Sequence, residues 1–168
     1  MRSWHSGKPA GPLSAFGAAL VAAVVVVDQL SKAVADTRLP PGEAIDLLPI
    51  LTLYRVNNTG IAFSFLAGLG PGLLIGLTIA ISAIVIVLWA RARDGGLFAA
   101  AGFALILGGA IGNLVDRLRL GYVIDFLLLH LGDRTLFVFN LADAALTLGP
   151  ALLLLVYLWP AAPGSSPS

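Results

Sequence analysis

Four long apolar stretches constrain the fold of this chain more than any other feature of the sequence. A transmembrane helix needs about 20 consecutive, mostly apolar residues. The stretches that meet this requirement cover, approximately, residues 13–35, 72–90, 97–115 and 141–159. Only 11% of the residues are charged, whereas a soluble domain carries about 25%. The sequence therefore predicts an all-α integral membrane protein with four transmembrane helices.

The four stretches are expected to form one membrane-embedded domain over residues 1–160. Residues 161–168 are polar and rich in Pro and Ser, a composition that predicts a disordered tail. The first stretch also resembles a signal peptide, because basic residues precede it and "AVA" at 33–35 resembles a cleavage site. The segment "DQLSK" at 28–32 is unusually polar for a signal peptide. We therefore expect this stretch to be kept as a helix.

Two long connections carry strand-like sequence. Residues 51–58, "LTLYRVNN", have β-branched and aromatic side chains at a period of two before an Asn-rich turn, a pattern that predicts a strand. Residues 135–139, "TLFVF", predict a second strand in the other connection. The third connection, "RARDGG" at 91–96, is short enough to be a tight turn.

The basic residues leave the orientation in the membrane open. The N-terminal segment carries Arg2 and Lys8, and the turn at 91–96 adds two arginines. The two longer connections carry more basic residues in total, and by count the positive-inside rule would place them in the cytoplasm. Several of these residues, however, lie among acidic side chains. We favour a cytoplasmic N-terminus and short turn, with the longer connections on the outer face.

Polar residues gather where three of the apolar stretches begin or end, and in the longer connections between them. If the helices alternate in direction, these positions share one face of the membrane. The members of the cluster are Asp28, Lys32, Asn58, Asn113, Asp116, Arg117, Asp125, Asn140 and Asp143. Ionisable groups are costly inside a membrane and are functional candidates by default. A polar cluster at one face would suit a site that uses water.

The residue inventory limits the chemistry of such a site to carboxylates. The chain has no cysteine and only two histidines, so thiol catalysis, Cys-ligated zinc and a two-histidine metal helix are excluded, and no metal or cofactor is expected. A net charge of +1 without a basic patch argues against a nucleic-acid partner. Two neighbouring aspartates cannot both ionise readily, so one can hold a proton while the other activates water.

Each polar segment also has a purely structural interpretation. Asp28 and Lys32 are four residues apart and could form an ion pair at the membrane interface. The motif "NLVDR" at 113–117 could supply a hydrogen bond between helices and charge at a helix end. The motif "NLAD" at 140–143 could be a helix N-cap followed by a favourable acid in the first turn. The residues alone leave these alternatives open.

Four motifs together resemble the lipoprotein signal peptidase (signal peptidase II) family. They are "DQLSK" at 28–32, "NNTGIAFSFLAG" at 57–68, "GGAIGNLVDRLRLGYVIDFL" at 108–127 and "FNLADAALTLG" at 139–149. The resemblance covers most of the chain in the family's order. It implies an aspartyl endopeptidase in the bacterial cytoplasmic (inner) membrane, with both termini in the cytoplasm. It also implies a small β-structure from residues 36–70 and an active site near the outer face.

The resemblance further implies a substrate and roles for the polar residues. The enzyme would remove signal peptides from diacylglyceryl-modified prolipoproteins by cleaving before the lipidated cysteine. Its partners would be these substrates and membrane lipids, and it would act as a monomer. By motif position Asp125 and Asp143 match the two catalytic aspartates. The supporting polar residues of the family are matched by Asp28, Asn58, Asn113, Asp116, Arg117 and Asn140. Among these, Asp116 is expected to be held against Arg117 in a structural role.

Two other classes of protein are alternatives. A small four-helix proton-coupled transporter could use Asp28, Asp116 or Asp143 as proton sites. Such a protein would be expected to carry a carboxylate near the middle of a span, whereas these acids lie near span ends. A non-catalytic membrane scaffold would have no use for so many Asn and Asp residues.

Overall fold

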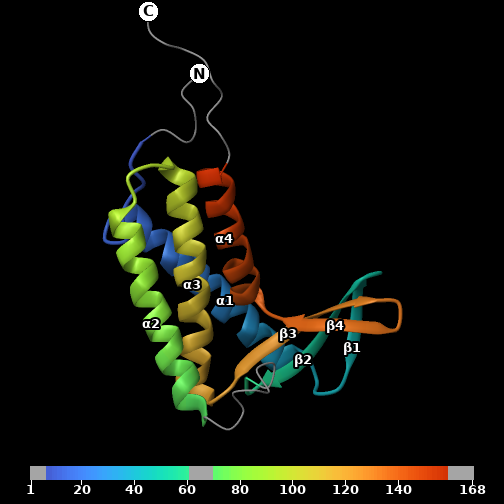
Figure 1. The fold of residues 1–168 in the computed structure, drawn as a ribbon. Coiled ribbons are helices and arrows are strands. Elements are labelled where there is room, and N and C mark those ends of the chain that lie inside the picture. The colour runs from blue at the N-terminus through green and yellow to red at the C-terminus, as the bar shows by residue number, and fades with distance from the viewer. Residues whose placement is uncertain (1–6, 61–69, 159–168) are drawn as a thin grey trace, which may run out of the picture.

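Four long helices form a bundle in the computed structural model, which describes residues 7–60 and 70–158. They are α1 (Ala15–Arg38), α2 (Gly70–Arg91), α3 (Gly96–Leu120) and α4 (Leu141–Leu158). All four are long and apolar enough to cross a membrane, as the sequence predicted. The start of α1, the α2–α3 connection and the end of α4 lie at one end of the bundle (Figure 1). The predicted tail and residues 61–68 of the second motif lie outside the described residues.

Helix α3 is the centre of the bundle and packs against the other three helices. In its most apolar 18-residue window 61% of the residues are buried, against 6% in the window of α2. Glycines in α3 allow this close packing. A Cβ atom on Gly109 would lie 2.5 Å from the carbonyl oxygen of Ala142 in α4, and small residues are the usual means of close helix approach in membranes.

A four-stranded antiparallel sheet lies at the other end of the bundle, so the predicted all-α class is too narrow (Figure 1). Its strands, in spatial order, are β1 (Ala44–Leu48), β2 (Leu51–Asn58), β3 (Val123–Leu131) and β4 (Arg134–Phe139). The strands predicted at 51–58 and 135–139 are confirmed as β2 and β4. The β-structure expected from residues 36–70 supplies only half of this sheet.

Strand β3 was not predicted, although it carries Asp125. Its sequence, "VIDFLLLHL", has no alternation of apolar and polar residues, and its first four residues are all buried. A strand covered on both faces gives an apolar run that sequence periodicity cannot identify. The strand begins close to the end of α3 because Gly121 ends that helix in a left-handed conformation, with φ 82°. Glycine is the usual residue at this position.

Candidate active site

Asp125 lies on β3 with its side chain buried, at 2% exposure. Its Cα partner on β2 is Val56, and residues two apart on a strand face the same side. Asn58 therefore shares the face of Asp125, and its Nδ2 donates to Asp125 Oδ2 at 2.9 Å. The Oδ1 atom of Asn58 accepts from the N–H of Gly60 at 2.8 Å. This Asx turn fixes which end of the Asn58 amide faces the carboxylate.

Asp143 lies in the first turn of α4 and is held by the cap of its own helix. Asn140 Oδ1 accepts from the N–H of Asp143 at 2.9 Å, and Asp143 Oδ2 accepts from the N–H of Asn140 at 3.2 Å. This reciprocal pair is a capping box, so the N-cap interpretation of Asn140 is confirmed. The pair also fixes the direction of the Asp143 carboxylate.

Asn140 makes further hydrogen bonds besides those of the cap, and through them it links the two aspartates. Its Nδ2 donates to Asp125 Oδ1 at 2.6 Å and to Asn113 Oδ1 at 3.2 Å. Asn113, from α3, donates through its Nδ2 to Asp143 Oδ1 at 2.8 Å. Residues 18 positions apart in the sequence, on β3 and α4, thus share one set of amide donors.

Burial raises the pKa of Asp125 to about 6, from an ordinary value of 3.8. The hydrogen bond from Asn58 opposes this shift, the negative charge of Asp143 adds to it, and Asn140 and Lys32 oppose it again. The loss of hydration therefore outweighs the amide donors. Asp143 is only partly buried. The two carboxyl groups have different surroundings, which is the condition for one to hold a proton while the other is ionised.

A buried ion-pair network lies beneath these aspartates. Lys32 Nζ lies 2.9 Å from Asp28 Oδ2 and 2.9 Å from Asp116 Oδ2. The pairing of Asp28 with Lys32 is confirmed, but inside the bundle rather than at the interface. The expected pairing of Asp116 with Arg117 is wrong, because its ion-pair partner is Lys32. Adjacent residues on a helix point in different directions. Asp116 points into the bundle, whereas the Arg117 side chain is only partly buried.

Asp28 and Asp116 each join two elements. Asp28, on α1, accepts from the N–H of Ala142 in the first turn of α4 at 2.9 Å. Asp116, on α3, accepts from the N–H of Ile124 on β3 at 3.2 Å. Such bonds satisfy buried donors that would otherwise be costly. The positions of the α4 cap and of the strand that carries Asp125 both depend on these two carboxylates.

Arg117 lies half-buried at the edge of the cluster. Its Nη1 lies 3.4 Å from the carbonyl oxygen of Asn113, and its charge interacts with Asp143, Asp125 and Asp116. The structure thus brings together all eight residues predicted for the site, with Arg117 at the margin. Among the described residues, no three His, Cys, Asp or Glu side chains are grouped so as to hold a metal ion.

Two residues of this network, Gln29 and Lys32, were not among the residues matched to the family's site, although Lys32 was counted in the polar cluster. Gln29 donates through Nε2 to Asp116 Oδ1 at 2.9 Å and to the carbonyl oxygen of Gly112 at 3.1 Å. Lys32 was interpreted only as the partner of Asp28. Both belong to the motif "DQLSK", so the motif was the available signal. The partners on α3 lie more than 80 residues away in sequence, and no local pattern indicates them.

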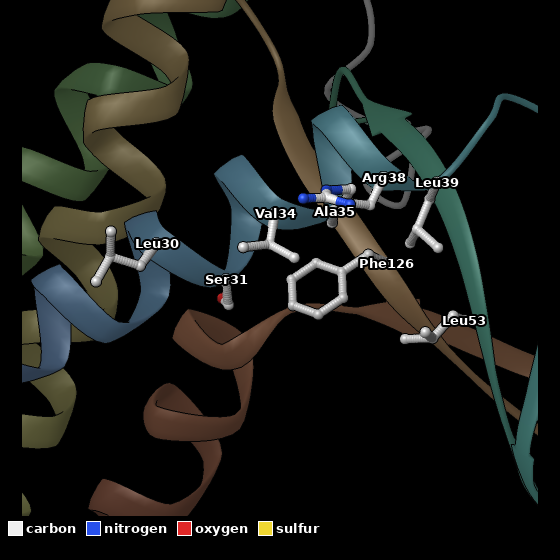
Figure 2. A pocket seen from close by; sticks show the side chains of 8 residues that line it. All are labelled: Leu30, Ser31, Val34, Ala35, Arg38, Leu39, Leu53 and Phe126. Atoms are coloured by element: carbon white, nitrogen blue, oxygen red, sulfur yellow. The ribbon is translucent and has the colours of Figure 1, made fainter.

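An apolar groove of about 370 Å³ lies beside the cluster, between the C-terminal half of α1 and strands β2 and β3. Figure 2 shows the ring of Phe126 facing Val34 and Ala35 of α1. Phe126 directly follows Asp125 in the chain and points to the other face of β3. The residues that line the groove are Leu30, Ser31, Val34, Ala35, Arg38, Leu39, Leu53 and Phe126.

Four membrane-length helices with paired carboxyl groups at one end define the class: an integral membrane protein with a polar, carboxylate-bearing site. A family model described as "Signal peptidase (SPase) II" matches residues 20–159. The chain belongs to this family. It is therefore an aspartyl protease, a transmembrane hydrolase of lipoprotein processing in the bacterial inner membrane. Because the chain belongs to this family, we no longer consider the transporter and scaffold alternatives.

Individual relatives and solved structures agree with the family model. The chain is 48% identical over 136 residues to the lipoprotein signal peptidases of Brucella ovis and Brucella melitensis, covering 81% of this chain and 85% of each relative. A bacterial membrane enzyme solved by the in meso method at 1.9 Å resolution has a TM-score of 0.79 at 26% identity, covering 92% of this chain and 98% of that chain. A second, at 2.3 Å resolution, has a TM-score of 0.79 at 25% identity, covering 98% and 99%.

Proposed function

We propose that this protein cleaves diacylglyceryl-modified prolipoproteins at the peptide bond before the lipidated cysteine. The observation that carries the proposal is the convergence of Asp125 and Asp143 on Asn140 and Asn113. Support for the substrate comes from relatives named lipoprotein signal peptidase. A site at the sheet end of the helix bundle also fits a peptide whose lipid anchor holds it at the bilayer surface.

In this proposal the two aspartates act as acid and base on one water molecule. Asp143, which is less buried than Asp125, acts as the base and removes a proton as the water oxygen attacks the scissile carbonyl carbon. Asp125, whose pKa is raised to about 6, carries the proton and donates it to the carbonyl oxygen. The tetrahedral intermediate then collapses and the C–N bond breaks. The new amine takes the proton held by Asp143, and one hydroxyl of the intermediate returns its proton to Asp125 as the new carboxyl group forms, so both aspartates regain their starting states. No covalent enzyme intermediate forms.

The remaining polar residues hold this pair in place. Asn58 and Asn140 orient Asp125, and Asn113 orients Asp143. Arg117, at the edge of the cluster, is placed to bind the substrate backbone. The buried carboxylates Asp28 and Asp116 support the elements on which the two aspartates lie, as their bonds to α4 and β3 indicate.

We propose that the groove beside Phe126 receives an acyl chain of the substrate. The groove is almost wholly apolar and lies at the same end of the bundle as the aspartates. Burial of an acyl chain contributes about 0.8 kcal/mol for each CH₂ group. A diacylglyceryl group carries no charge. The one basic residue that lines the groove, Arg38, is the last residue of α1. The groove can therefore accept an acyl chain without removing water from a charged group.

We further propose that both termini face the cytoplasm and that the sheet lies on the outer face. Prolipoprotein cleavage sites reach that face after export, which fits a site at the sheet end of the bundle. All of the candidate site residues come from one chain, so a monomer is sufficient for activity. Residues 1–160 would then form a single peptidase domain.

The test is cleavage of a purified, lipid-modified prolipoprotein by the purified protein, with the product identified by mass spectrometry. The proposal predicts a product whose first residue is the lipidated cysteine, and little cleavage of the same prolipoprotein without the lipid. Cleavage at another bond, or equal cleavage of both substrates, would refute the proposed specificity.

A further inference from the structure

Lys32 is buried at 1% exposure and uses all of its hydrogen-bond donors. Besides the two carboxylates, its Nζ donates to Asn113 Oδ1 at 2.8 Å. An ammonium group has three N–H donors, and here each faces one acceptor: Asp28, Asp116 and Asn113. Charge compensation alone would need only the carboxylates, so the third bond requires its own explanation.

The third bond fixes the orientation of the Asn113 amide. The Oδ1 atom of Asn113 accepts from Lys32 and from Asn140 Nδ2, at 2.8 and 3.2 Å. An amide turned by 180° would place its NH₂ group against these two donors, which is unfavourable. The NH₂ group must therefore face the other way, where it donates to Asp143 Oδ1 at 2.8 Å.

We propose that Lys32 is a positioning residue for Asp143 and acts through Asn113. The inference rests on the proposed function of the two aspartates. Lys32 holds the amide so that a donor, never an acceptor, faces the carboxylate that activates water. Without the ammonium group only the longer bond from Asn140, at 3.2 Å, holds the Oδ1 atom of Asn113. The amide then turns more readily, and Asp143 meets an oxygen in place of an N–H for part of the time.

The alternative is that Lys32 only neutralises the two carboxylates that it contacts. The variant K32M alone does not separate these roles, because it leaves two buried carboxylates without a cation. The double variant K32M/D116N removes one positive and one negative charge together, so the net charge of the network stays the same. The single variant D116N is the control, because Lys32 and its bond to Asn113 remain.

The test is a mutant cycle of K32M/D116N and N113L, with kcat and KM measured on a lipid-modified prolipoprotein and folding followed by thermal unfolding. We expect K32M/D116N to lower kcat about 10- to 100-fold with KM nearly unchanged, the effect of losing one hydrogen bond to a charged group. D116N should lose less. Because Lys32 acts through Asn113, the triple variant K32M/N113L/D116N should be no slower than N113L.

Multiplied losses in the triple variant, or an equal loss in D116N, would overturn the proposal and leave Lys32 a structural role. If K32M/D116N does not fold, K32M/D28N offers a second charge-matched pair. Failure of both pairs to fold would show that Lys32 is required for the fold itself and would also overturn the positioning role. Failure of the wild-type protein to cleave would instead refute the proposed function.

Discussion

At the scale of single residues, the surroundings of Asp125 combine opposing effects. Two amide groups donate to its carboxylate, from Asn58 and Asn140, and such bonds favour the charged form. Burial and the neighbouring Asp143 favour the neutral form, and they prevail, because the pKa of Asp125 is raised to about 6. Asp125 can therefore hold its proton at a higher pH than an ordinary aspartate, whose pKa is 3.8.

We predict that Asn58→Ala moves the alkaline limb of the pH–activity profile to higher pH. Asn58 donates to ionised Asp125 and lowers its pKa, so its removal raises that pKa and Asp125 keeps its proton further up the pH scale. The measurement is kcat/KM against pH. Asn57→Ala is the matched control, because Asn57 is the exposed neighbour on β2. A limb that stays in place, or moves to lower pH, would contradict the role given to Asn58.

At the scale of elements, the N-terminus of α4 is completed by another helix. The N–H of Ala142 bonds to Asp28 of α1, and α3 approaches both through Gly112. A Cβ atom on Gly112 would lie 2.5 Å from Asp28 Oδ2 and 3.4 Å from the Cβ of Ala142. The junction of three helices under the aspartates therefore has no room for a further methyl group.

We predict that Gly112→Ala destabilises the protein by about 1–3 kcal/mol, the usual cost of overpacking. It should also lower activity, because Asp28 must shift away from the α4 cap. Gly76→Ala is the matched control, since a Cβ atom there has no neighbour within 4 Å and alanine favours a helix over glycine. The measurement is the thermal unfolding midpoint in detergent. Equal midpoints for the two variants would show that the junction is not tightly packed.

We predict that Val34→Phe lowers kcat/KM for lipid-modified substrate about tenfold, because the larger ring fills the groove beside Phe126. Val26→Phe is the matched control. Both valines lie on α1 and are similarly exposed, at 60% and 53%, but Val26 does not line the groove. The assay is steady-state cleavage with both variants. If the two variants behave alike, the acyl chain does not occupy this groove.

The sequence predicted the elements that show a long apolar run or a strand-like pattern of side chains. It did not predict the element that is buried by contacts with other parts of the chain. Apolar length located all four helices, alternation located β2, and the run "TLFVF" located β4. β3 was missed because its first residues are covered on both faces. The resemblance to the family predicted that Asp125 and Asp143 act as a pair. No local pattern could show that Asp116 pairs with Lys32, because the two residues are 84 positions apart in the sequence.

At the scale of the whole molecule, the sheet and the α2–α3 connection lie at opposite ends of the bundle (Figure 1). The site is at the sheet end, where α1, α3, α4 and β3 meet. The whole site therefore faces one side of the membrane, and the direction of insertion of the bundle decides which side that is. The proposed function requires this end to face the outer side of the membrane, where exported substrates arrive.

We predict that a cysteine at Asp133 reacts with a membrane-impermeant thiol reagent in intact spheroplasts, and that a cysteine at Arg93 reacts only after permeabilisation. Both positions are exposed: Asp133 lies in the β3–β4 turn of the sheet and Arg93 lies in the α2–α3 connection. The chain has no cysteine of its own, so each label reports one position. Labelling of Arg93→Cys in intact spheroplasts would invert the orientation.

The turnover of Asp125→Asn, Asp143→Asn and the double variant shows whether Asp125 and Asp143 act as one acid–base pair. We predict that each single variant folds but loses about 10²- to 10⁴-fold in kcat on lipid-modified prolipoprotein. The double variant should be little worse, because the pair acts as a unit. Asp133→Asn, an exposed aspartate in the β3–β4 turn, should keep wild-type turnover. A folded Asp125→Asn or Asp143→Asn variant with near wild-type kcat would contradict the account.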